Sequence, residues 1–160
     1  MLTELRLRNF KGFNRHTIPL RDRSVLVGRN NAGKSTIIEA LRLIAIVADR
    51  YTSLVYREPP AWTDLPLVKR GVAPSLRGLE FNFDTAFHGL GEGPAVLTAK
   101  FASRETIEIF IGSDDLHAVI TDRAGVPISS KSQALKLRLP RVSIQPQVGP
   151  LLREEVIRDP

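Results

Sequence analysis

The sequence predicts an α/β fold in which one amphipathic helix combines with short antiparallel strands, and three observations lead to this prediction. Residues 2–8 alternate apolar and polar side chains, which is the period of a half-buried strand. Apolar positions from Lys34 onward follow helical spacing, which predicts a helix ending near Asp49 and Arg50. Between residues 79 and 139, short β-like runs separated by Gly, Asp and Ser predict an antiparallel meander.

The N-terminal strand is expected to begin a β-hairpin. Residues 9–13 read as a turn, and residues 16–20 read as a second strand that pairs back on the first. Residues 24–27 form a short, continuously apolar run, which predicts a third strand buried on both faces.

The meander is predicted from five runs rich in β-branched and aromatic residues: 79–84, 95–102, 106–111, 117–121 and 135–139. Before it, residues 57–78 contain four prolines and little periodicity, which is typical of a long irregular loop. After it, residues 141–145 read as a further strand, and a helix is expected from about residue 151.

The composition is that of a globular protein. Hydrophobic residues make up 42% of the 160 positions and charged residues 25%, which argues against a disordered chain. The absence of cysteine excludes disulfides and thiolate metal sites. Basic residues interrupt the N-terminus, so no signal peptide is predicted, and the longest apolar run, 43–48, is too short to cross a membrane. We therefore expect a cytoplasmic protein without a membrane partner.

Positive charge is concentrated near the N-terminus. Residues 1–50 contain ten Lys or Arg and four acids, which accounts for the whole net charge of +6. Such an excess suits a polyanion such as DNA, and it also suits a site for a triphosphate. The charge pattern leaves both interpretations open.

Residues 28–35, GRNNAGKS, fit the phosphate-binding pattern G-x-x-x-x-G-K-[ST], and Thr36 follows. Glycines let the loop backbone point its N–H groups at phosphate oxygens, and Lys34 adds an ammonium for the β- and γ-phosphates. The Ser35 hydroxyl is a candidate Mg²⁺ ligand. The predicted nucleotide-binding residues are Gly28, Arg29, Asn30, Asn31, Ala32, Gly33, Lys34, Ser35 and Thr36.

Two other patterns are better explained as turns. Asp114 and Asp115 follow an apolar run, as the acidic partner of Mg²⁺ would, but Gly112 and Ser113 intervene and favour a hairpin turn. Residues 122–125 match the D-x-x-G of GTPase switches, yet the same residues form ordinary turns. No N-K-x-D motif is present, so guanine specificity is not expected.

The segment LTELRLRNFKGFNRHTIPLRDRSVLVGRNNAGKSTIIEALRLI resembles the start of ABC-type ATPase heads in the SMC, RecF, RecN and OLD group. The shared features are a basic hairpin with N-F-K-G-F, a short apolar run and then G-R-N-N-A-G-K-S-T. The last motif is most similar to OLD-like and related bacterial AAA-type ATPases. The close match covers about the first 48 residues. It implies a P-loop NTPase fold, the N-terminal lobe of an ABC-type head, with an antiparallel β-subdomain.

The resemblance implies roles for further residues. In this group the early hairpin contacts adenine and ribose, which implicates Arg8, Asn9 and Lys11. A glutamine loop follows the meander, so Gln147, or as second choice Gln145, would ligate Mg²⁺ and sense the γ-phosphate. Lys34 and Gln147 would then be the catalytic residues, with ATP and Mg²⁺ as cofactors.

The residue patterns and the resemblance together lead us to expect an organisation into four segments. These are a basic β-hairpin, P-loop strand and first helix (1–50), a Pro-rich irregular insertion (51–78), an antiparallel β-meander (79–140), and a glutamine-loop strand with the start of a helical arm (141–160).

Three motifs of the family are missing from the sequence: the LSGGQ-like signature, of which residues 129–133 are only a faint echo, the Walker B Asp-Glu and the switch histidine. In the family they lie beyond the arm. We therefore expect the N-terminal half of a head, inactive alone, which needs the C-terminal half as a partner.

The implied function is that of an ATPase in DNA repair and maintenance or in defence against phage. Two heads would sandwich ATP in a homodimer or higher oligomer, and their closure would act on DNA or an effector nuclease. Two alternatives remain open: a P-loop kinase of a nucleotide or other small molecule, and a non-hydrolysing scaffold assembled by ATP.

Overall fold

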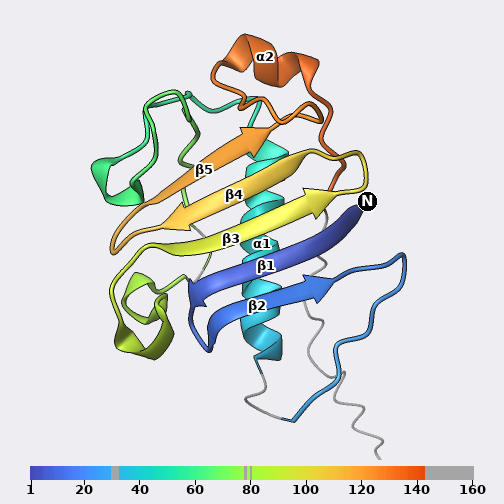
Figure 1. Cartoon of the computed structure of the whole chain (residues 1–160), viewed down its shortest axis with the longest axis vertical. Helices are drawn as coiled ribbons and strands as arrows, with labels where there is room; N and C mark the ends of the chain where they lie inside the picture. The colour runs from blue at the N-terminus through green and yellow to red at the C-terminus, as the bar shows by residue number, and fades with distance from the viewer. Residues whose placement is uncertain (30–32, 78, 80, 143–160) are drawn as a thin grey trace, which may run out of the picture.

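A single antiparallel sheet with a long helix across one face dominates the computed structural model, which describes residues 1–29, 33–77, 79 and 81–142 (Figure 1). The sheet order is β2-β1-β3-β4-β5, and every neighbouring pair is antiparallel. The strands are β1 (Leu2–Phe10), β2 (Phe13–Pro19), β3 (Ala95–Phe101), β4 (Thr106–Ile111) and β5 (Leu116–Thr121). The α-helices are α1 (Lys34–Arg50) and α2 (Lys131–Lys136), and short 3₁₀ turns lie at Ala61–Thr63, Phe83–Thr85 and His88–Leu90.

The predicted hairpin, long helix and central meander are confirmed. Helix α1 begins and ends where its periodicity predicts, and β3, β4 and β5 agree with the predicted runs to within one residue at each end. The acidic pair after β4 lies in a hairpin turn, in which Gly112 N donates to Asp115 O at 2.8 Å. The D-x-x-G segment is also a turn, because Asp122 Oδ1 accepts hydrogen bonds from the backbone of Ala124 and Val126.

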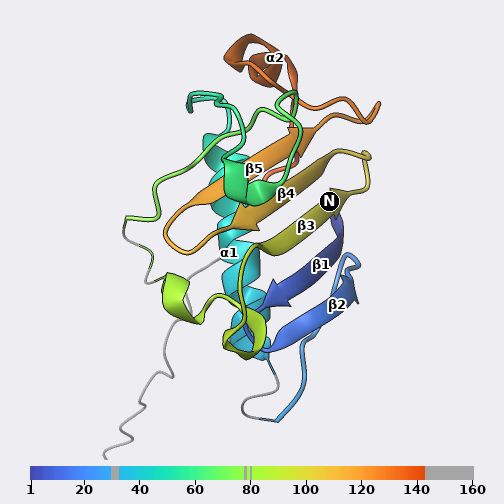
Figure 2. The ribbon, with the colours of Figure 1, turned by 60° about the vertical axis from the view of Figure 1, so that its left-hand side comes forward.

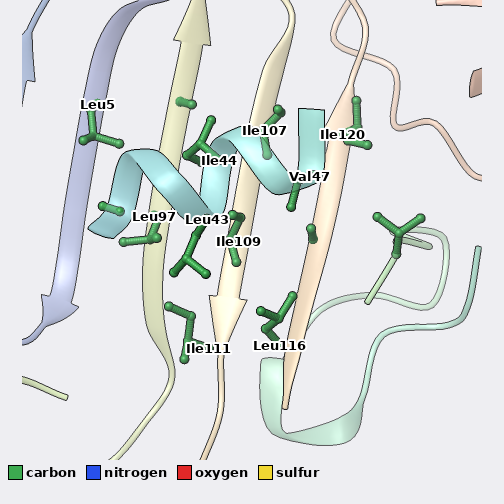
Figure 3. Close-up of a cluster of buried hydrophobic side chains, with 14 of the residues drawn as sticks. Leu5, Leu43, Ile44, Val47, Leu97, Ile107, Ile109, Ile111, Leu116 and Ile120 are labelled. Carbon is green, nitrogen blue, oxygen red and sulfur yellow. The ribbon is translucent and has the colours of Figure 1, made fainter. Parts of the chain in front are cut away.

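The core lies between α1 and the sheet. Helix α1 buries residues spaced three and four apart, so one stripe of the helix faces the strands. Alternate residues of β1, β3, β4 and β5 point at this stripe (Figure 3). The packed side chains include Leu43, Ile44 and Val47 of the helix and Leu5, Leu97, Ile107, Ile109, Ile111, Leu116 and Ile120 of the sheet.

The prediction of a buried strand at residues 24–27 is wrong. The described part of this segment has no strand, and Val25 and Val27 are 85% and 89% exposed. A strand needs the backbone of a neighbour to pair with, and the edges of the described sheet, β2 and β5, do not pair with this run. Its apolar side chains are therefore left uncovered by the residues that the structure describes.

Two strands predicted for the ends of the meander are also wrong. In the run at 79–84, Asn82 Oδ1 accepts from Asp84 N at 2.9 Å, and this side-chain turn starts a 3₁₀ helix instead of a strand. The run at 135–139 is preceded by Ser130, whose side chain caps α2 by accepting from Gln133 N. Local capping outweighs β propensity in both places.

The Pro-rich insertion is irregular in its described residues, as predicted, and part of it packs on the outer sheet face. Its backbone forms isolated bridges between Arg57 and Gly71 and between Val72 and Ala118. Trp62 packs with Leu65 on a small apolar cluster of Val96, Phe110 and Val119, on the side of the sheet away from α1. Figure 2 shows this segment in front of β4 and β5 but not in front of β1 and β2. None of the helices in the described ranges combines the length and apolar character needed to cross a bilayer.

Candidate functional site

The candidate site lies at the N-terminal end of α1, close to the hairpin that joins β1 and β2. Gly33 precedes the helix with φ 84°, in the left-handed region that suits glycine. Among the described residues, no side chain caps this end, and the first turn of the helix contains no acid. Ile37 N donates to Gly33 O at 3.0 Å, so the N–H groups of the preceding residues have no partner within the helix. These N–H groups without a partner in the helix, together with the helix dipole, make this end suitable for an anion.

The Lys34 side chain turns back over the glycine loop. Its ammonium donates hydrogen bonds to Gly28 O and, at 2.7 Å, to Arg29 O. This places a positive charge beside both the first loop glycine and the start of the helix. The sequence motif is therefore folded with its lysine, its second glycine and the helix terminus gathered at one place, which is the donor set that phosphate oxygens require.

Ser35 lies in the first turn of α1 and is exposed. Its hydroxyl is free to approach a metal ion that also binds phosphate, as Mg²⁺ does, since Mg²⁺ keeps several waters and needs few protein ligands. Within the described ranges, no group of three His, Asp or Glu side chains is arranged to hold a metal. The residues present thus fit Mg²⁺ that arrives with a triphosphate better than a metal bound by protein alone.

The β1–β2 hairpin supports the loop from one side through Phe13. A Cβ built on Gly33 would stand 2.5 Å from Phe13 Cζ, so the phenyl ring would have to shift to admit any residue other than glycine. Phe13 in turn stacks on the exposed ring of His16, with centroids 4.9 Å apart. Sequence reasoning missed this contact. The only signal was the aromatic residue in the motif of the hairpin turn.

Two of the three hairpin residues that the resemblance implicates are engaged within the protein. Asn9 has φ 53°, and its side chain donates to Glu92 O at 2.7 Å and accepts from His88 N at 3.2 Å. Lys11 forms an ion pair with Glu39 of α1. Both residues therefore fix the hairpin to neighbouring segments.

Arg8 is placed differently. It is exposed and lies between the buried Leu7 and the left-handed Asn9, on the sheet face opposite α1. Among the described residues it forms no ion pair, in contrast to Lys11. Contacts of Arg8, Asn9 and Lys11 with a nucleotide remain predictions.

Several predicted site residues lie outside the described ranges. These are Asn30, Asn31 and Ala32 of the loop and the two glutamines, Gln145 and Gln147. The faint echo of a signature motif at 129–133 is a helix cap, because Ser129 N donates to Gln133 Oε1 at 2.8 Å.

Comparison with known proteins identifies a family for this chain. The model of the AAA ATPase domain family matches residues 1–133, so the chain belongs to this family. No curated protein matches the chain. Membership implies a P-loop NTPase, and it indicates an ATPase that binds ATP, in general together with Mg²⁺. The phosphate-binding interpretation of residues 28–36 and the family thus point to the same chemistry.

Proposed function

We propose that this chain is the ATP-binding half of an ATPase head of the SMC, RecF and OLD-like group. The observation that carries the proposal is the convergence at the start of α1 of the Lys34 ammonium, the left-handed Gly33 and the helix N-terminus. These groups would hold the triphosphate, and Ser35 would hold the Mg²⁺ that accompanies it. Bound Mg²⁺ would neutralise charge that develops between the β- and γ-phosphates.

The residues of this chain bind and orient the nucleotide in this proposal. Lys34 would leave the carbonyls of Gly28 and Arg29 for the phosphates, exchanging neutral acceptors for charged ones. Gln147 would sense the γ-phosphate. Acidic and signature residues of the other half of the head would complete the site, and two heads would close on ATP and act on DNA or an effector nuclease, in repair or in defence against phage.

The test is ATP hydrolysis by the full-length protein with and without duplex DNA. The proposal expects hydrolysis that rises with DNA and disappears in Lys34→Ala. Transfer of phosphate to a small acceptor, independent of DNA, would favour the kinase alternative and contradict the proposal. ATP-dependent assembly without hydrolysis would favour the scaffold.

A further inference from the structure

The face of the sheet opposite α1 is basic over β1 and β2. Leu5 and Leu7 are buried on the α1 side, so the alternation of the strand turns Arg6 and Arg8 to the outer face. The register of the hairpin sets Arg8 directly opposite Arg15, and Arg6 directly opposite Thr17. Three arginines from two neighbouring strands therefore share one small area.

This area is a groove of about 340 Å³. Arginines from β1 and β2 line one side of it, and β3 and β4 line the other side with Thr98 and Glu108. The insertion ends the groove toward β5, because Trp62 and Leu65 cover the apolar cluster there. The groove is open to solvent above β1 and β2, and Arg6, Arg8 and Arg15 are exposed in it.

The charges of the groove are only partly balanced. Glu4 Oε1 lies 2.7 Å from Arg6 Nε and 3.1 Å from Lys100 Nζ. Burial acts to raise the pKa of Glu4, but the hydrogen bonds from Lys100 and Arg6 hold the pKa below its usual value, so Glu4 stays ionised. Glu108 Oε2 lies 3.9 Å from Lys69 Nζ.

Arg8 and Arg15 differ from these residues. In the part of the chain that the structure describes, neither forms an ion pair. Like charges directly opposite each other on antiparallel strands destabilise a sheet, so this pair does not serve the fold. Guanidinium groups bind phosphate in a bidentate geometry and are always charged, which makes a phosphate-bearing partner the natural explanation for keeping them together.

We propose that this groove binds the phosphodiester backbone of a nucleic acid, with Arg8 and Arg15 on phosphates and Arg6 beside them. Residues two apart on a strand are about 6.6 Å apart, and directly opposed residues are about 5 Å apart. The three arginines thus leave the sheet at separate points of the groove, which suits a row of phosphates better than one isolated ion. The inference deepens the proposed function, since it names the surface on which the ATPase meets DNA.

The experiment measures binding of a fluorescein-labelled duplex DNA of about 20 base pairs to the whole chain, by anisotropy, across a series of salt concentrations and without nucleotide. The variant is Arg8→Gln with Arg15→Gln. The control is Arg123→Gln with Lys131→Gln, which removes two charges from exposed positions beyond β5. Since no ATP is present, the result is independent of whether Lys34 binds a nucleotide.

The double arginine variant is expected to bind DNA at least about 10-fold more weakly than the control. Its salt dependence should be shallower by about two in the slope of log K against log salt, since each lost phosphate contact removes about 0.9. Its melting temperature should be unchanged or raised, because the opposed charges repel.

Equal affinity and slope in the two variants would overturn the proposal. Inorganic phosphate or polyglutamate, tested as competitors at constant ionic strength, should not displace the DNA at low millimolar concentration. Binding of phosphate or polyglutamate that depends on Arg8 and Arg15, with DNA binding unaffected by the substitutions, would also overturn it.

Discussion

Phe13 closes the space around Gly33, the second glycine of the phosphate-binding loop. A Cβ at Gly33 would stand 2.5 Å from Phe13 Cζ and 2.9 Å from Cε2. The hairpin therefore restricts which residue can stand directly before α1. Gly33 and the basic hairpin lie in contact, although 19 residues separate Phe13 from Gly33 in the sequence.

Gly33→Ala should destabilise the protein more than Gly125→Ala. Both glycines have nearly the same φ, 84° and 83°, so both substitutions carry the strain of a left-handed alanine, about 1–2 kcal/mol. Only Gly33 also meets a side chain, which adds about 1–3 kcal/mol of overpacking, whereas nothing lies within 4 Å of a Cβ at Gly125. Urea unfolding of the two variants measures the difference.

The same substitution made together with Phe13→Ala separates the two costs. Without the ring, Gly33→Ala should lower the free energy of unfolding only as much as Gly125→Ala does. If the cost of Gly33→Ala is the same with and without the ring, Phe13 does not buttress the loop.

Asn9 should matter for the geometry of the hairpin. Simple alternation after Leu7 would turn Phe10 outward, but the left-handed Asn9 turns it into the core, where it is fully buried. Asn9→Gly keeps this backbone conformation and loses the side-chain hydrogen bonds to the backbone of Glu92 and His88, at about 1–2 kcal/mol. Asn9→Ala should cost about 1 kcal/mol more, because alanine resists the left-handed region. Thermal melting of both variants tests this order, and equal melting temperatures would contradict it.

The stability of the protein should fall at mildly acidic pH through His117. This residue is 2% exposed, and burial lowers its pKa, although the Lys69 carbonyl and the charge of Asp115 act in the opposite direction. In the unfolded chain His117 takes up a proton near its ordinary pKa of about 6.5, whereas in the folded chain it resists protonation. Stability is therefore lost as pH falls through about 6.5. Well above this pH, His117 is neutral in both the folded and the unfolded chain, and it contributes nothing to the pH dependence.

Urea unfolding at about pH 5 and about pH 7.5 measures this effect in the wild type and in His117→Gln. Glutamine keeps a donor for Lys69 O and does not titrate in this range. The free energy of unfolding should drop more in the wild type than in the variant. A drop of the same size in both would show that other groups cause the pH dependence.

Elements with a clear period could be predicted from the sequence. Alternation in residues 2–8 and helical spacing after Lys34 place β1 and α1, because each element buries one side against the same core. The apolar run at 24–27 led to the wrong prediction of a strand. Apolar side chains show that a segment favours burial, but they do not show whether a neighbouring strand is present to pair with it. At 79–84 and 135–139, single side-chain caps on Asn82 and Ser130 decided the structure.

The candidate site could likewise be predicted only in part. The spacing of glycines, lysine and serine in residues 28–36 predicts phosphate chemistry, since each residue type has its own role there. Tertiary contacts could not be predicted: Phe13 against Gly33, and Asn9 and Lys11 engaged with residues far along the chain. The opposition of Arg8 and Arg15 depends on the register of the hairpin, which only the structure gives.

Binding of Mg²⁺–ATP to wild type, Lys34→Ala and Lys136→Ala tests the central claim most directly. Lys136→Ala removes an exposed charge at the end of α2 and serves as the control, and melting temperatures show that each variant is folded. The wild type and the control should bind ATP alike, and Lys34→Ala should lose at least about 100-fold in affinity, or ~2.7 kcal/mol. An unchanged affinity of a folded Lys34→Ala would contradict the assignment of residues 28–36 as the ATP site.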